Sequence, residues 1–351
     1  MSPKVSVIIP AYNAEEYIDD LMASLQAQTL RDIEVILVDD GSADKTGEKM
    51  LPWTERDSRF HCIHQENQGA GPARNTGIAH AKGEYLICID ADDLYMPEMM
   101  ELLYDGAKKF DADITICNYI RKDYWNGRED KLGTGKCVLD TLITAKDTDK
   151  GIWSVTLNPH NKLYKTEFVK SNHLEYEARN ICNDVGFVLR AIILAGSIVC
   201  LPDSPMIIRT HLDNRSISSN RYKYLEESIR VYEDAFKWIK SHPVDDDVFA
   251  AMEQQMANTF AYQLSYGYKK EYFDELRVLL SELSYDKRDI KPLKDHCGRI
   301  LKRWRKKLIK LYDSYYSGEK TEAAWNSVIG AQNRVLGMSM VMDIIEETGH
   351  E

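Results

Sequence analysis

The sequence predicts an α/β domain with a mostly parallel sheet and helices on both faces, followed by a region made only of helices. Up to about residue 218, short apolar runs alternate with segments whose apolar residues recur at helical spacing, and beyond it only helical spacing recurs. The chain of 351 residues is also longer than one typical domain. We therefore expect an α/β domain over residues 1–218 and a helical C-terminal domain over residues 219–351.

Apolar runs rich in Val, Ile, Leu and Tyr mark the expected strands of the first domain. They cover residues 5–9, 33–38, 60–64, 85–89 and 113–119. Segments of helical spacing lie between them, over residues 14–28, from 44 onward, over 72–81 and over 97–110. The helix at 72–81 begins with a proline, which suits a first helical turn.

The second half of the chain has two textures. Residues 120–160 are rich in Gly, Asp, Lys and Thr without clear periodicity, so a loop over a site is expected there. Alternation resumes at residues 163–170, 185–195 and 198–201. Amphipathic helices are then expected at 226–240, 248–266, 272–283, 290–316 and, more weakly, 326–347.

Composition excludes several classes of protein. A net charge of −11 disfavours general nucleic-acid binding, which needs a basic surface. Seven cysteines without a CxxC pair do not resemble a disulfide framework or a zinc site and fit a reduced cytosol, so a cytoplasmic protein is expected. The sequence has no uncharged apolar run of about 18 residues, the length that a spanning helix needs.

The most informative polar group follows the strand at 85–89 and consists of Asp90, Asp92 and Asp93. Ligands of open α/β sheets bind beyond the carboxyl ends of the strands. Asp90 and Asp92 share one face of an ideal strand, and converging carboxylates suit a hard divalent cation shared with substrate phosphates. The alternative is a turn in which Asp92 and Asp93 cap the next helix.

Polar residues also follow the other strands. Tyr12 could provide a stacking surface for a nucleotide base, Asp40 a polar partner for the base edge, and a cation on Asp92 charge compensation for a diphosphate. A glycine-rich loop at 67–75 runs into a helix, where Arg74 could face the diphosphate or the base. Taken singly, Tyr12 could be a core residue, Asp40 part of an ordinary turn, and Arg74 a solvent-facing helical residue.

Four segments in this order resemble the motif set of family 2 glycosyltransferases with the GT-A fold. The resemblance is strong over about residues 4–120 and weaker to about 218. Its motifs are Ser6-Val7-Ile8-Ile9-Pro10-Ala11-Tyr12-Asn13, Val38-Asp39-Asp40-Gly41-Ser42, Gly71-Pro72-Ala73-Arg74-Asn75-Thr76-Gly77 and Ile89-Asp90-Ala91-Asp92-Asp93.

The resemblance assigns roles to these residues. It implies that Pro10, Tyr12 and Asp40 hold the uracil of a UDP-sugar, and that Asp90 faces the ribose. Asp92 would bind Mn²⁺ or Mg²⁺ on the diphosphate. The adjacent Asp93 would support the sugar or the local turn.

The resemblance also implies a catalytic base. Family members use an Asp after a Glu at the start of a helix, and the matching stretch here places Asp184 in the base position with Asn183 where Glu is usual. The departure keeps the base and removes a neighbouring negative charge. Direct attack with one base would invert the anomeric centre. The alternative for Asp184 is a helix N-cap.

Candidate acceptor residues lie further along. Lys162 belongs to a stretch resembling one beneath the acceptor site of the family, and Trp153 just before it could stack on a sugar, although a core tryptophan is the favoured reading. His211, in a segment resembling the closing loop of the family, could join the metal or the phosphates. An ordinary surface histidine is the alternative.

The helix expected around residues 300–312 has a cationic face and an apolar face containing Trp304, which is typical of a helix on an anionic membrane surface. The alternative is a helix packed on its own domain or on another subunit of a homo-oligomer.

The resulting prediction is an inverting glycosyltransferase that moves a hexose or N-acetylhexosamine from a UDP-sugar to a hydroxyl of a glycan, glycolipid or glycoprotein. Bacterial surface polysaccharide or glycoprotein assembly is the expected setting, with a cytoplasmic location that includes peripheral contact with the membrane. The alternatives are a sugar nucleotidyltransferase, which would carry a Gly-, Arg- and Lys-rich signature after the first strand, and a nucleotide-sugar-binding scaffold without catalysis. A Rossmann dehydrogenase is disfavoured because no GxGxxG follows the first strand.

Overall fold

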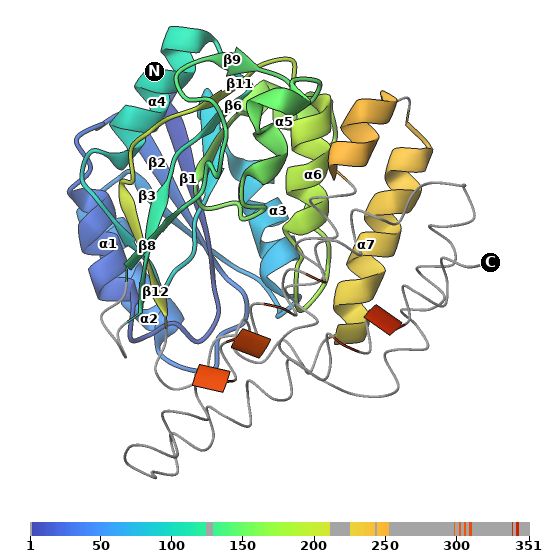
Figure 1. The fold of residues 1–351 in the computed structure, drawn as a ribbon. Coiled ribbons are helices and arrows are strands. Elements are labelled where there is room, and N and C mark those ends of the chain that lie inside the picture. The colour runs from blue at the N-terminus through green and yellow to red at the C-terminus, as the bar shows by residue number, and fades with distance from the viewer. Residues whose placement is uncertain are drawn as a thin grey trace. The chain divides into compact units, whose positions relative to one another are not determined.

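The structure is a computed structural model that describes residues 2–123, 129–210, 225–242 and 244–252, together with a few positions between 298 and 343. The chain divides into two units, Met1–Asp213 and Asn214–Glu351, which are described separately. The first unit contains all the strands of the described residues (Figure 1).

An eight-stranded sheet forms the centre of the first unit, in the order β3-β2-β1-β4-β10-β6-β11-β9. Strands β3, β2, β1 and β4 are parallel, as are β6 and β11, whereas β10 is antiparallel to both its neighbours and β9 is antiparallel to β11. The strands are β1 Val5–Ala11, β2 Ile33–Asp39, β3 Phe60–His64, β4 Tyr85–Cys88, β6 Ile114–Ile116, β9 Leu142–Ile143, β10 Lys162–Lys165 and β11 Ile198–Cys200. The predicted α/β class with a mostly parallel sheet is confirmed.

The register of the central strands brings the predicted motifs to one edge of the sheet. In β1, Ala11 pairs with Asp39 of β2, and Ile8 pairs with Cys88 of β4. All seven residues of β2 are buried, as expected for a strand covered on both faces. The carboxyl ends of β1, β2 and β4 therefore lie side by side, and each is followed by one of the polar motifs.

Helices cover both faces of this sheet (Figure 1). Alternate residues of β1 and β2 share one core with α1 and α4, whereas Ile8 faces α3 on the other side. The helices of the first unit are α1 Ile18–Gln26, α2 Thr46–Arg56, α3 Ala70–His80, α4 Met99–Phe110, α5 Thr166–Ser171 and α6 Val185–Leu194, with 3₁₀ turns η1 Thr148–Lys150 and η2 Ile152–Ser154.

A second sheet of four strands, in the order β5-β12-β7-β8, corrects one prediction. A loop was expected over residues 120–160, but β7, β8 and β9 form within this range, and the strand expected over 113–119 is divided between β6 and β7. β7 and β8 are half-exposed and charged, and Arg121 pairs with Asp130 across them at 3.0 Å. Such strands carry little apolar periodicity. The strands are β5 Leu94–Tyr95, β7 Tyr119–Asp123, β8 Glu129–Leu132 and β12 Met206–Thr210.

Most of the described residues of the second unit are helical. Helix α7, Leu225–Lys240, confirms the helix predicted over 226–240, and residues 246–252 are also helical. The remaining predicted helices lie largely outside the described residues. None of the helices in the described ranges is both long enough and apolar enough to cross a bilayer.

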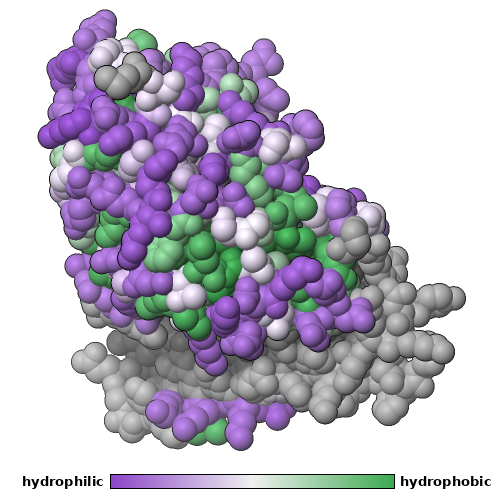
Figure 2. Space-filling model, turned by 90° about the horizontal axis from the view of Figure 1, so that it is seen from above, coloured by the Kyte–Doolittle hydropathy of each residue, from purple (hydrophilic) through white to green (hydrophobic). Residues whose placement is uncertain are grey.

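Figure 2 shows one face of the molecule, which is largely hydrophilic with hydrophobic side chains gathered near its centre. Scattered exposed apolar residues are normal for a folded protein. Among the described residues of the first unit, the large hydrophobic side chains that remain exposed are Tyr12, Leu51, Val138, Leu139 and Leu142.

Close packing of α3 on β1 makes the first prediction. A Cβ atom at Gly77 would lie 2.3 Å from Cγ2 of Ile8. Replacing glycine by alanine in an open helix stabilises by roughly 1 kcal/mol, but overpacking costs about 1–3 kcal/mol. We expect Gly77→Ala to lower the free energy of unfolding in urea. The control is Ala79→Gly, which measures helix propensity at an exposed position of α3. A gain for Gly77→Ala equal to the loss for the control would contradict the close packing.

Candidate functional site

The first two strand ends carry residues in very different surroundings. Tyr12 is 53% exposed, whereas Asp40 is 2% exposed. The Asp40 carboxylate accepts hydrogen bonds from Gln65 Nε2 at 2.7 Å and from the backbone N–H groups of Gln68 and Gly69 at 3.0 and 2.8 Å. Because Gly69 directly precedes α3, Asp40 fixes the start of that helix. Pro10, at the end of β1, is half-buried.

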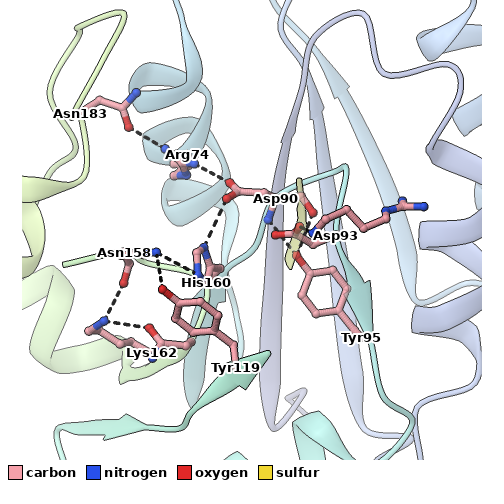
Figure 3. Close-up of polar contacts among 11 residues, drawn as sticks. Arg74, Asp90, Asp93, Tyr95, Tyr119, Asn158, His160, Lys162 and Asn183 are labelled. Carbon is pink, nitrogen blue, oxygen red and sulfur yellow. Dashed lines mark hydrogen bonds and ion pairs between the residues drawn. The ribbon is translucent and has the colours of Figure 1, made fainter. Parts of the chain in front are cut away.

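Asp90 is the centre of the polar cluster beyond β4 (Figure 3). Its Oδ1 accepts from Arg74 at 2.7 Å, and its Oδ2 lies 3.4 Å from Nδ1 of His160. Burial alone would raise the pKa of Asp90, but the His160 hydrogen bond and the Arg74 charge outweigh it and hold that pKa well below its usual range. Asp90 is therefore a carboxylate in the folded protein.

Arg74 points into the protein and is 6% exposed, so it is not a solvent-facing helical residue. Besides Asp90, its guanidinium donates to Asn183 Oδ1 at 2.7 Å and lies 5.3 Å from the ring centre of Tyr176. Arg74 thus connects the turn after β4 to the segment that precedes α6. The sequence analysis placed both regions near the site but did not predict this direct link.

His160 was not singled out from the sequence, although the stretch containing it was. The ring is 5% exposed and packs edge-on against Tyr119, with centroids 5.1 Å apart. Nε2 lies 3.2 Å from the side-chain nitrogen of Asn158 and Nδ1 lies 3.4 Å from Asp90, and the tautomer of the ring sets which of the two nitrogens carries the hydrogen. The sequence signal that could have indicated His160 was its position two residues before the buried strand β10.

Asp90, Asp93 and His160 can offer ligand atoms that all lie within 4.8 Å of one another. Two carboxylates and an imidazole form a donor set that suits Mn²⁺ and related divalent ions. Burial, and then the charges of Asp92 and Asp90, raise the pKa of Asp93 well above its usual value, so a bound cation would relieve this repulsion. Asp92, the ligand expected from the sequence, is half-buried on the same turn and is not one of the three.

Arg209 also holds the aspartate-rich turn. It opens the segment that resembles the closing loop of the family, but its contacts with this turn were not predicted. It lies on β12, where its Nε donates to the backbone carbonyl of Asp92 at 2.6 Å and its backbone N–H donates to Asp93 at 3.0 Å. Its guanidinium lies 5.2 Å from the ring centre of Tyr17. The second sheet therefore supports the turn through a residue more than a hundred positions away.

Asp184 stands at the N-cap position of α6, but within the described part of the chain its side chain makes no capping hydrogen bond. Burial raises the pKa of Asp184 above its ordinary value of 3.8, although the Arg74 charge opposes the shift. The Asp184 carboxylate therefore has a higher proton affinity than an exposed carboxylate. It does not cap the helix through its side chain. These properties suit a general base.

The three candidate acceptor residues have different outcomes. Trp153 is 7% exposed and donates its indole N–H to the carbonyl of Ala145 at 3.0 Å, as a core tryptophan does. Lys162 is fully buried, and its ammonium donates to the carbonyls of Thr156 and Asn158 at 2.7 Å each and to Asn161 Oδ1 at 2.8 Å. Burial lowers the pKa of Lys162 to about 7. His211 lies outside the described residues.

The fold is an α/β sheet with an aspartate-rich edge, and comparison with known proteins gives the family. Residues 6–171 match the family model for "Glycosyl transferase family 2". Glycosyltransferase GlyG of Streptococcus pneumoniae serotype 4 is 36% identical over 217 residues, which are 60% of this chain and 71% of that protein. The putative glycosyltransferase EpsH of Bacillus subtilis is 33% identical over 66% of this chain and 68% of that protein.

The chain therefore belongs to glycosyltransferase family 2 and is an enzyme of glycosyl transfer, as the resemblance implied. Among solved structures, S. aureus TarS 1–349 in complex with UDP-GlcNAc superposes with a TM-score of 0.64. It is 19% identical, and the match covers 99% of this chain and 92% of that one. This similarity confirms the GT-A fold.

The candidate cation site makes the second prediction. We expect His160→Gln to weaken Mn²⁺ binding about tenfold or more, because one of three converging ligands is lost. Mn²⁺ titration in the presence of UDP, followed by calorimetry, measures the effect. His80→Gln, which changes an exposed histidine of α3, is the control. Asp92→Ala in the same assay tests the ligand expected from the sequence, and unchanged affinity in His160→Gln would contradict the site.

Proposed function

We propose that this enzyme transfers a hexose or N-acetylhexosamine from a UDP-sugar to a hydroxyl group of a glycan, glycolipid or glycoprotein, with inversion and with Asp184 as the base. The observation that carries this proposal is the connected set Asn183, Arg74, Asp90 and His160. It joins the residue next to the proposed base to the aspartates of the proposed diphosphate site (Figure 3).

In the proposed reaction the acceptor oxygen attacks the anomeric carbon as the bond from that carbon to the diphosphate oxygen breaks. Asp184 accepts the proton of the attacking hydroxyl, and UDP leaves with the electron pair. One displacement on the face opposite the leaving group inverts the anomeric centre. The raised pKa of Asp184 supports this role, since a base of higher proton affinity takes the proton more readily.

The proposed donor pocket lies at the ends of β1, β2 and β4. Exposed Tyr12 and half-buried Pro10 have apolar surface for a uracil ring. Two of the hydrogen bonds that Asp40 accepts go to Oδ1 and one to Oδ2, which leaves a lone pair on Oδ2 for one donor such as the uracil N3–H. The UDP-GlcNAc complex of TarS, a protein of the same fold, supports a UDP-sugar.

We propose that the divalent cation is Mn²⁺ or Mg²⁺ and that Asp90, Asp93 and His160 are ligands. Asp92, which lies on the same turn, remains a proposed ligand from the sequence. When bound, such an ion neutralises charge on the leaving diphosphate. Asp90 also remains the proposed partner of the ribose and Asp93 of the sugar. The Arg74 guanidinium already donates to Asp90 and Asn183, so we propose that it acts on the donor through Asp90.

We further propose a role in bacterial surface polysaccharide or glycoprotein assembly, with Lys162 shaping the acceptor side and Trp153 and His211 as less favoured contacts. Assembly into a homo-oligomer is also part of this proposal. A cytoplasmic location is supported by the cysteines of the described residues, none of which forms a disulfide bond.

The base proposal makes the third prediction. We expect Asp184→Asn to lower kcat by about 10² to 10⁴, because proton removal is lost, while the affinity for UDP stays within about a factor of two. At saturating donor, acceptor and metal, wild-type kcat should fall as the pH decreases through an apparent pKa above 3.8, since Asp184 must be ionised to act.

UDP release measures turnover, and isothermal calorimetry measures UDP binding. NMR of the product gives the anomeric configuration. Near-normal kcat in Asp184→Asn would refute the base, and a product that retains the donor configuration would refute direct displacement.

Membrane contact through residues 300–312 is part of the proposal and gives the fourth prediction. The described positions of this helix that carry positive charge are exposed and recur at helical spacing, as expected of one helix face. We expect their replacement by Glu to abolish co-sedimentation with phosphatidylserine-containing vesicles. These positions are Lys302, Arg305, Lys306 and Lys310.

The matched control makes the same change of net charge at four exposed lysines of the first unit. They are Lys82, Lys109, Lys131 and Lys136. Equal vesicle binding by the two variants and the wild type would contradict membrane contact through this helix.

A further inference from the structure

The segment between α5 and α6, residues 172–184, contains the proposed base but has no helix or strand of its own. Asn75 of α3 holds it through its backbone. The side-chain nitrogen of Asn75 donates to the carbonyl of Tyr176 at 2.8 Å, and the backbone N–H of Tyr176 donates to Asn75 Oδ1 at 2.8 Å. One amide side chain thus pairs with both polar groups of a single residue, as a neighbouring β-strand would.

The surrounding packing shows that this contact is closely fitted. A Cβ atom at Gly71, one helical turn before Asn75, would lie 2.0 Å from the carbonyl oxygen of Glu177. The backbone of α3 and the backbone of the segment therefore touch without an intervening side chain. Any residue larger than glycine at this position would push the segment away from the helix.

Two contacts link Tyr176 to the residues on either side of Asp184. The ring of Tyr176 stacks on Phe187 of α6, with centroids 4.0 Å apart and planes 5° from parallel. The backbone N–H of Glu177, the next residue, donates to the carbonyl of Asn183 at 3.2 Å. Asp184 lies between Asn183 and the first residues of α6, so both routes converge on it.

We propose that Asn75 is a positioning residue, which sets the distance between Asp184 and the aspartates beyond β4. This inference rests on the proposed role of Asp184 as base. Consecutive residues of α3 then divide the work. Arg74 binds the end of the segment and Asp90 together, whereas Asn75 binds the middle of the segment through main-chain atoms.

The principal experiment compares Asn75→Ala with the wild type. We expect kcat to fall about 10- to 100-fold, because a base displaced by about an ångström reacts poorly, while UDP affinity stays within about a factor of two. Hydrogen exchange at the Tyr176 amide should accelerate, since its acceptor is gone. Asn172→Ala is the matched control, because it removes an amide at the start of the same segment that bonds to Phe168 O and not to α3.

A double-mutant cycle separates positioning from a general structural role. In the Asp184→Asn background, adding Asn75→Ala should lower the residual kcat by less than about twofold, since residues that act as one unit are not additive. If Asn75→Ala lowered kcat in the Asp184→Asn background as much as it does in the wild type, Asn75 would act by another route and the inference would be overturned. Wild-type kcat in Asn75→Ala would overturn it as well.

Asn75→Asp keeps the acceptor for the Tyr176 N–H but places a carboxylate oxygen, in place of the donor, against the Tyr176 carbonyl. It should lower kcat at least as far as the alanine variant does, because two oxygens then face each other. If Asn75→Ala fails to bind UDP, the double-mutant cycle is measured with Asn75→Asp and Asp184→Asn instead. Failure of the base proposal itself would be recognised separately, because Asp184→Asn alone would then turn over normally.

Discussion

A buried guanidinium joins the two halves of this site, and the rest of the arrangement depends on it. Arg74 is 6% exposed and holds Asp90 with one nitrogen and Asn183 with another. Breaking a buried pair by removing one partner costs about 3–5 kcal/mol, because the other charge is left uncompensated. Asn183 fits this position because a neutral amide accepts from Arg74 without competing with Asp90 for the single positive charge. The departure from the usual Glu thus leaves Arg74 paired with one carboxylate.

Around this pair, neighbouring residues hold the other charged groups of the site in place from several elements of the fold. The aspartate-rich turn is held by Arg209 from the second sheet, and His160 is oriented by Asn158. Beneath His160, three acceptor oxygens surround the buried Lys162 and match the three N–H bonds of an ammonium group. Charged groups held in place by several partners suit electrostatic stabilisation in an enzyme, which depends on groups that are oriented in advance.

Local sequence signals predicted the strands and the residues of single motifs. They did not predict contacts between residues that are far apart in the sequence. The strands over β1 to β4 were found within two residues of their bounds, because they are continuous apolar runs. Arg74 and Asp90 were singled out because they follow strands in recognisable motifs. The contacts that hold these residues and Asp93 were not predicted, because they join residues far apart in the sequence. His160 lies 70 residues from Asp90, and Arg209 lies 116 residues from Asp93. Short charged strands such as β8 carry no periodicity to read.

The antiparallel strand β10 has a consequence for how the chain must assemble. It lies between β4 and β6, yet it is formed by residues 162–165, well after both of them in the sequence. During synthesis the four parallel strands β3-β2-β1-β4 can pair first, and β4 stays an open edge until β10 emerges. The strands β6 and β11 can join this sheet only after that. The same insertion carries His160 to Asp90, so the aspartate-rich turn gains its imidazole partner only when the two portions of the sheet are closed.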